Sequence, residues 1–202
     1  MSSEPLVLGF DTSAAHCAAA LLRGNDVLAA RLEEMTRGQA ERLMSLLEEV
    51  LAEGGASWQD LDAIGVGIGP GNFTGIRIAV SAARGLALGL EIPAVGVDGF
   101  EARAAEGTLP AVPAPRDQVY AALPAGGGSE APRLMPRAEA EAAARGAGLA
   151  FAPEASPAGI AEAIARIAAT RLDGPVEAPA PLYLRPADAA PARDLPPDLI
   201  DE

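Results

Sequence analysis

Short apolar runs and amphipathic stretches alternate along the first half of the chain. The apolar runs are bounded by turn-forming residues and are typical of strands, and they cover Leu6–Phe10, Cys17–Leu22, Val27–Leu32, Asp62–Gly69 and Pro93–Val97. The connections between the first three runs are short, and Gly24-Asn25-Asp26 is a turn signal. We therefore expect two antiparallel hairpins in a row, followed by strands separated by helices.

The helical pattern of the first half predicts three helices. Residues 36–53 carry a wide apolar stripe, with Thr36 and Gln39 in the spacing of a capping box and Gly54-Gly55 as the stop. A second capping box, Asp98 with Glu101, predicts a short helix over 98–106. The helix predicted over 76–88 is apolar nearly all round, and one sheet can cover only one side of it. We therefore expect another lobe or another subunit to cover the rest.

The second half is broken by proline, since only three of the 18 prolines precede residue 110. We divide the chain into a first lobe of residues 1–106, a smaller second lobe of 107–185 and a proline-rich tail of 186–202. The predicted elements of the second lobe are strands at Val119–Leu123 and Leu149–Ala152, a loop at Gly126–Ser129, and helices at Arg137–Arg145 and Pro157–Thr170. Ser156 and Pro157 suit the start of the last helix.

Charge and rare residues exclude several classes of function. The net charge is −13, which argues against direct binding of RNA or DNA, because phosphate contacts need lysine and arginine. The chain has no lysine, which removes lysine-based catalysis and the P-loop lysine. His16 and Cys17 are the only residues of their types, so a Cys/His zinc site is excluded. We expect a cytoplasmic protein with no leader peptide and no membrane span.

Two segments have the composition of a phosphate site. Asp11, Thr12 and Ser13 end the first strand, where a carboxylate and two hydroxyls suit a phosphate and a hydrated metal; the alternative is an ordinary turn. The loop before the second helix can bind an anion through its backbone N–H groups and the helix dipole. The alternative is a tight crossover that needs glycine for packing. The loop's candidate residues are Gly69, Gly71, Asn72, Thr74 and Gly75.

Other polar residues carry weaker signals. We interpret His16 as a partly exposed side chain and Cys17 as a core thiol. Arg77 and Arg84 lie seven residues apart on one helix face. They could meet a phosphate or a partner's carboxylate, or simply be solvated.

Three segments resemble the TsaB (YeaZ) family. They are LVLGFDTS at residues 6–13, VGIGPGNFTGIRIAVSAARGLALGLEIPAVGV at 66–97 and APLYLR at 180–185. The resemblance implies an α/β fold of the actin/Hsp70-like (ASKHA, ribonuclease H-like) type with two lobes, the C-terminal lobe being reduced here. It also implies a role as the non-catalytic partner of TsaD in the complex that makes N6-threonylcarbamoyladenosine next to the tRNA anticodon. The ATPase TsaE would join that complex, and tRNA would be contacted only indirectly.

The resemblance also assigns a partner surface to the helices at 36–53 and 76–88. Its residues would be Leu43, Met44, Leu47, Val50, Ile76, Arg77, Val80, Ala83, Arg84 and Ala87. The same surface would form a homodimer when TsaD is absent. ATP or ADP with magnesium is a possible ligand at this partner interface.

Where TsaD carries the metal-binding sequence His-Met-Glu-Gly-His, this chain has Gly99-Phe-Glu-Ala-Arg103. Both histidine ligands are replaced, so the chain is expected to bind no metal and to have no catalytic activity alone. Two alternatives stay open, a nucleotide-binding homodimer and a weak ATPase or kinase that uses Asp11 and the glycine loop. The family often has His-Ser/Thr-Glu at the start of the first helix, and this chain has Gln39-Ala40-Glu41.

Overall fold

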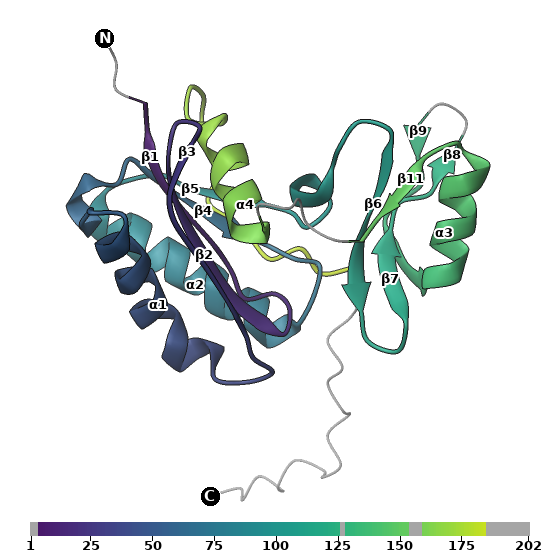
Figure 1. Cartoon of the computed structure of the whole chain (residues 1–202), viewed down its shortest axis with the longest axis horizontal. Coiled ribbons are helices and arrows are strands. Elements are labelled where there is room, and N and C mark those ends of the chain that lie inside the picture. Colours follow the sequence, from purple (N-terminus) through teal and green to yellow (C-terminus); the bar gives the residue numbers. More distant parts are fainter. Residues whose placement is uncertain (1–3, 126–127, 154–158, 185–202) are drawn as a thin grey trace, which may run out of the picture.

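A computed structural model describes residues 4–125, 128–153 and 159–184. Its first sheet has five strands in the order β3-β2-β1-β4-β5 (Figure 1). The strands β1, β2 and β3 are antiparallel neighbours, and β4 and β5 continue in parallel from β1. The strands are β1 (Leu6–Asp11), β2 (His16–Arg23), β3 (Asp26–Glu34), β4 (Ala63–Gly67) and β5 (Ala94–Val97). All five strands predicted from the apolar runs are confirmed.

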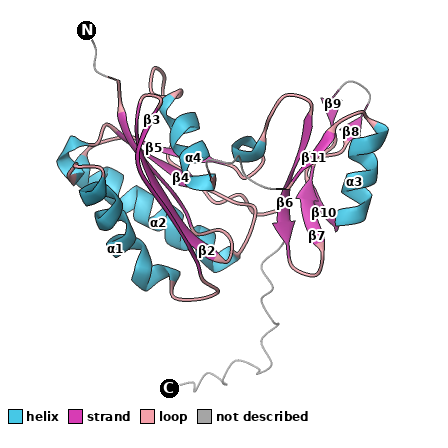
Figure 2. Cartoon of the chain, viewed as in Figure 1, coloured by secondary structure: helices cyan, strands magenta, loops and turns pink. Residues whose placement is uncertain are grey.

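Helices cover both faces of this sheet. The helices α1 (Gln39–Glu53) and α2 (Phe73–Leu90) pack on one face, and α4 (Ile160–Ala169) packs on the other (Figure 2). Every residue of β1 is therefore buried, with Leu6, Leu8 and Phe10 facing α1 and α2 and Val7 facing α4. A strand buried on both faces has a continuous apolar sequence rather than an alternating one.

The helix starts differ from the predictions in two places. The capping box predicted at Thr36 does not form: α1 begins at Gln39, and Gly38 (φ 90°) holds the N-cap position with no side-chain cap. The Gln39 side chain instead donates to the Met35 carbonyl at 3.2 Å. The helix α2 begins at Phe73, three residues before the predicted start, because the Asn72 side chain caps it by accepting from the Gly75 N–H.

The predicted helix at 98–106 is wrong, although its capping bonds form. The Asp98 carboxylate accepts from the Glu101 N–H at 2.8 Å, and the Glu101 carboxylate accepts from the Asp98 N–H at 3.1 Å. They begin only the single 3₁₀ turn η2 (Glu101–Arg103), after which the chain is extended at Ala104. A further 3₁₀ turn, η1 (Trp58–Asp60), precedes β4.

The second sheet has the order β10-β7-β6-β11, with α3 (Arg137–Gly146) on one face. Its strands are β6 (Thr108–Ala114), β7 (Gln118–Ala121), β10 (Arg133–Pro136) and β11 (Ala150–Ala152). A two-stranded hairpin, β8 (Pro124–Ala125) with β9 (Gly128–Ser129), stands where a loop was predicted. The strands β6 and β10 were not predicted, because proline argues against a strand.

The helix α4 returns to the first sheet instead of joining the second. Its residues Ile160, Ala161, Ile164, Ala165 and Ala168 share a buried cluster with Val7 and Ala20. The segment that follows also lies on the first sheet, because the Leu182 N–H donates to the Ile68 carbonyl at 2.8 Å. The predicted 107–185 lobe is therefore not one packing unit in space. The Ser156-Pro157 cap and the tail 186–202 lie outside the described residues, and the N-cap of α4 is Gly159.

The helix α2 has the length and hydropathy of a membrane span, with a mean hydropathy of 1.3 over Phe73–Leu90. This is a weak indication, because a core helix of a globular protein passes the same test. One face of α2, with Ile76, Ala79, Val80 and Ala83, packs in the core. In all, 28% of the helix is buried, so its other face lies open to solvent over the described part of the chain.

Candidate functional site

The two segments with the composition of a phosphate site lie together at one edge of the first sheet. The strands β1 and β4 are parallel neighbours, so the turn after β1 and the loop after β4 leave the sheet at the same end. The Asn72 N–H donates to the Ser13 carbonyl at 2.7 Å, and the Thr12 hydroxyl donates to the Gly75 carbonyl at 2.7 Å. The structure thus brings these candidate residues into one place.

Three glycines make this close approach possible. A Cβ on Gly71 would lie 2.2 Å from the Ser13 carbonyl oxygen, and one on Gly75 would lie 1.9 Å from the Thr12 carbonyl oxygen. Gly69 has a left-handed φ of 97°. These contacts support the alternative that the loop is a tight crossover whose glycines serve packing. The side chain of Thr74 points away from the core and is exposed.

The Asp11 carboxylate is already occupied by this chain's own groups. Asp11 is 2% exposed, and its Oδ2 accepts from the Ser13 N–H at 3.1 Å and from the Ser13 hydroxyl at 2.9 Å. The His16 Nε2 lies 2.6 Å from the same oxygen, with the histidine side chain only 16% exposed. The prediction that His16 is partly exposed is confirmed, and the structure adds that this side chain is the direct partner of Asp11. Its position five residues after Asp11, across one hairpin turn, is the signal that could have revealed this pair.

The other Asp11 oxygen has little room for a ligand. A Cβ on Gly67 would lie 1.9 Å from Asp11 Oδ1, so this oxygen rests against the backbone of β4. A hydrated magnesium ion needs a carboxylate oxygen facing water. Asp11 as it stands therefore does not suit a magnesium nucleotide.

Residues 99–103, at the place where TsaD would carry metal ligands, hold segments of this chain together through hydrogen bonds. The Arg103 guanidinium donates to the Gly99 carbonyl at 2.9 Å and to the Pro153 carbonyl at 3.0 Å. Arg171, just after α4, bonds the Glu101 carboxylate and the Gly96 carbonyl. Burial raises the pKa of the nearby Asp98 carboxyl. Within the described residues, no three His, Cys, Asp or Glu side chains gather to hold a metal.

The predicted partner surface is only partly at the surface. Of its ten residues, six are buried in the chain's own core, namely Leu43, Leu47, Val50, Ile76, Val80 and Ala83. Met44 is 40% exposed, Arg77 and Arg84 are exposed, and Ala87 is half-buried. The wide apolar stripe of α1 faces the first sheet, so most of the predicted contact side chains are not accessible. A partner would instead meet the outward side chains of α2, among them Leu88, which is 83% exposed.

A cluster that the sequence did not predict lies at the start of α2. The Arg77 guanidinium carbon is 3.8 Å from the centre of the Phe73 ring and 5.9 Å from that of Tyr183. The two rings are 4.7 Å apart, and Arg77 Nε donates to the Tyr183 hydroxyl at 3.0 Å. We call Phe73, Arg77 and Tyr183 the Arg77 cluster. The Arg77 cluster brings Tyr183, in the segment APLYLR, against the start of α2, although Arg77 and Tyr183 are 106 residues apart in the sequence.

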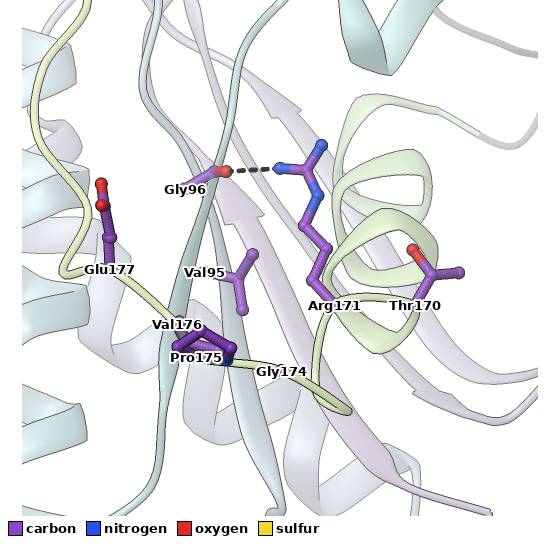
Figure 3. A pocket seen from close by; sticks show the side chains of 8 residues that line it. All are labelled: Val95, Gly96, Thr170, Arg171, Gly174, Pro175, Val176 and Glu177. Carbon is purple, nitrogen blue, oxygen red and sulfur yellow. Dashed lines mark hydrogen bonds between the residues drawn. The ribbon is translucent and has the colours of Figure 1, made fainter.

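A hollow of about 450 Å³ lies elsewhere, between β5 and residues 170–177 (Figure 3). It is lined by Val95, Gly96, Thr170, Arg171, Gly174, Pro175, Val176 and Glu177. None of the predicted site residues lines it, and the Arg171 guanidinium is already bonded to Gly96 and Glu101. We therefore do not count this hollow as part of the candidate site.

Cys17 is predicted to be unreactive in the folded chain. The thiol is fully buried, and burial, aided by the Glu33 carboxylate, raises the pKa of Cys17 to about 11. Compared with the ordinary pKa of 9.0, a pKa of about 11 leaves about 100-fold less thiolate at pH 8. Alkylation by iodoacetamide should therefore be at least about 100-fold slower in buffer than in denaturing urea. Equal rates in the two conditions would show that the thiol is accessible.

The strand order and the meeting of the turn after β1 with the loop after β4 define an α/β protein of the actin-like (ASKHA, ribonuclease H-like) class. Residues 32–133, half of the chain, match the family model described as "TsaD: tRNA N6-adenosine threonylcarbamoyltransferase". The solved structure of YeaZ from Pseudomonas aeruginosa is 31% identical, with a TM-score of 0.56 over 65% of this chain and 68% of that one. The chain belongs to the TsaB (YeaZ) family.

Curated relatives carry the same name. "tRNA threonylcarbamoyladenosine biosynthesis protein TsaB" of Escherichia coli is 38% identical over 45% of this chain and 39% of its own length. Its Bacillus subtilis counterpart is 36% identical over 58% of this chain and 54% of its own. The chain thus spans about half the length of these curated relatives or less. A second solved structure, described as similar to peptidase YeaZ of P. aeruginosa, is 23% identical with a TM-score of 0.68 over 90% of this chain and all of that one, which supports the fold.

Proposed function

We propose that this chain is a non-catalytic scaffold subunit that pairs with TsaD in the complex that makes tRNA threonylcarbamoyladenosine. The observation that carries the proposal is the outward face of α2. Its exposed side chains are Thr74, Arg77, Ser81, Arg84 and Leu88, the last 83% exposed, and the described part of the chain leaves them uncovered. The names of the curated relatives support the pathway, since they are called threonylcarbamoyladenosine biosynthesis proteins.

The side chains of this chain favour the absence of catalysis by the chain alone. Phosphoryl or acyl transfer needs a group that can reach substrate, hold a metal or move a proton. Here the Asp11 carboxylate is taken by His16 and Ser13, and the chain has no lysine. Arg103 sits where a metal ligand would be expected and bonds two backbone carbonyls. These observations favour an accessory role over a reaction centred on this chain.

We propose that TsaE joins the same complex and that tRNA contacts this chain only indirectly. The charge of −13 supports the second point, because a strongly acidic surface repels the phosphate backbone. Direct binding of the nucleic acid then falls to another subunit. A cytoplasmic location follows from this proposal, since tRNA is modified there.

A second candidate is a homodimer that binds nucleotide. The observation in its favour is again the outward face of α2, because an isologous dimer needs the same patch on both copies. Magnesium with ATP or ADP at the dimer or TsaD boundary would need metal ligands from outside this chain, since Asp11 is closed. A weak ATPase remains the enzymatic alternative. It requires steady ATP turnover that is lost on Asp11→Ala.

The proposal is tested by size-exclusion chromatography with light scattering. The chain is run alone, with TsaD of the same organism, and with TsaD and ATP. We expect a self-dimer or monomer alone and a one-to-one mixed species on addition of TsaD. If the chain and TsaD elute separately in all conditions, the scaffold role is wrong. A self-dimer that persists unchanged beside TsaD would favour the homodimer instead.

A further inference from the structure

We infer that the Arg77 cluster is a carboxylate-binding site, and that it anchors an acidic side chain of the protein partner to α2. This inference rests on the proposed function, since it assigns the contact that would hold the partner. The cluster combines two segments far apart in the sequence, the first turns of α2 and the segment around Tyr183. Both belong to the part of the chain that packs on the first sheet.

The Arg77 side chain is already held in place by its neighbours. Its guanidinium stacks on the Phe73 ring at 3.8 Å, and its Nε donates to the Tyr183 hydroxyl. Tyr183 is fixed in turn by its contact with Phe73 and by the backbone bond from Leu182 to Ile68. A long arginine side chain normally loses rotamer freedom on binding, and prior fixing removes most of that cost.

Within the part of the chain that the structure describes, the two terminal nitrogens of the Arg77 guanidinium have no hydrogen-bond partner. Over the described residues, Nε is the one guanidinium nitrogen of Arg77 with a hydrogen bond, and no carboxylate lies within ion-pair distance. Six other arginines do form such pairs there, namely Arg31, Arg42, Arg133, Arg137, Arg166 and Arg171. The two terminal nitrogens can therefore donate to the two oxygens of a carboxylate in the paired geometry that arginine favours.

The face of α2 around Arg77 is positively charged. Residues 73–90 contain no acidic residue, and their two charged side chains are Arg77 and Arg84. Both are exposed on the same face of α2 as Leu88. The chain has a net charge of −13, but this face of α2 carries two arginines and the exposed Leu88. It therefore complements a partner surface that is apolar and carries acidic groups. RNA phosphate would suit the same guanidinium, but the rest of the chain repels it.

The test measures the dissociation constant for TsaD by isothermal titration with full-length variants. Arg77→Lys keeps the charge but loses the planar fork and the stacking, and should weaken binding about 10-fold or more. Tyr183→Phe keeps the ring and removes the hydroxyl that holds Nε, and should weaken binding about 3-fold. Arg145→Lys, an exposed arginine at the end of α3, is the matched control and should stay within about 2-fold. Thermal melts check that all three variants are folded.

Each result bears on the inference. If wild type binds TsaD and Arg77→Lys binds equally well, the Arg77 cluster is not the anchor, although the scaffold role stands. If Arg77→Lys lowers only tRNA binding by the assembled complex, the ligand is phosphate and the carboxylate inference is wrong. If it lowers only self-association of the chain, the occupant is a second copy, and the inference is again wrong. If wild type itself does not bind TsaD, both the proposed function and the inference fail.

Discussion

Leu47→Glu is expected to unfold the chain, whereas Leu88→Glu is expected to leave it folded. Leu47 is fully buried in the core between α1 and the first sheet, and Leu88 is 83% exposed on α2. A charge placed in that core has no partner, and we expect it to cost more than about 4 kcal/mol. Folded domains are stable by roughly 5–15 kcal/mol, so a loss above about 4 kcal/mol removes most of the margin at the lower end of that range. The same substitution at an exposed site should change the free energy of unfolding by less than about 0.5 kcal/mol.

Urea unfolding followed by circular dichroism measures both changes, and the pair forms its own control because the substitution is the same. The expected outcome is a wild-type curve for Leu88→Glu and little or no cooperative transition for Leu47→Glu. The Leu88→Glu variant also reports on the partner surface, since a charge on the outward face of α2 should weaken binding of TsaD. A fully folded Leu47→Glu protein would show that the stripe of α1 faces outward, as the partner surface assigned by the resemblance requires.

The stripe of α1 illustrates what periodicity can and cannot show. The spacing of Leu43, Leu47 and Val50 predicts an amphipathic helix, and that helix is confirmed. Periodicity gives the direction of the apolar face but not the identity of the surface that covers it. The resemblance assigned this face to a partner, while the structure buries it against the chain's own sheet. The outward contacts of the α1 and α2 pair must come from other side chains, such as Met44 and Leu88.

The location of α4 could not be predicted from a pattern within α4 itself. The relevant signal lies in β1 and β4, where Gly9 and Gly65 stand side by side in the parallel register. A Cβ on Gly9 would lie 2.4 Å from the Ala161 carbonyl oxygen, and one on Gly65 would lie 3.0 Å from the Ala168 Cβ. The two neighbouring glycines and the alanine-rich sequence of α4 thus allow α4 to approach β1 and β4 very closely. A sequence interpretation that treats each segment separately does not connect features as far apart as Gly9 and Ala161 or Gly65 and Ala168.

The sequence predicted where the candidate site lies, but not that its Asp11 carboxylate is already bonded by His16. The end of β1 and the glycine loop meet as expected, because parallel strands end at the same edge of a sheet. The sequence did not show that the one histidine would lie on the Asp11 carboxylate, since the hairpin turn that folds His16 back is not determined by residue types alone. The Arg77 cluster was missed for a related reason, because Tyr183 comes from a segment with no regular secondary structure.

Gly75→Ala is expected to destabilise the chain by about 3 kcal/mol, although alanine is the better helix former. Gly75 lies in the first turn of α2, where an added Cβ would come within 1.9 Å of the Thr12 carbonyl oxygen. Overpacking costs roughly 1–3 kcal/mol, and here the obstacle is backbone that cannot rotate aside. To relieve the clash, α2 would have to move from β1. That movement would break the bond from the Thr12 hydroxyl to the Gly75 carbonyl.

Gly85→Ala is the matched control for this prediction. Gly85 lies in the same helix, and among the described residues nothing beyond its chain neighbours and the nearby backbone of α2 comes within 4 Å of an added Cβ, so only the intrinsic helix preference should operate. That preference favours alanine by about 0.5–1 kcal/mol, and the variant should be slightly more stable than wild type. Chemical denaturation of the two variants should therefore shift the midpoint in opposite directions. If Gly75→Ala is as stable as Gly85→Ala, the turn after β1 and the start of α2 are not in the close contact described, and the candidate site is more open than its hydrogen bonds indicate.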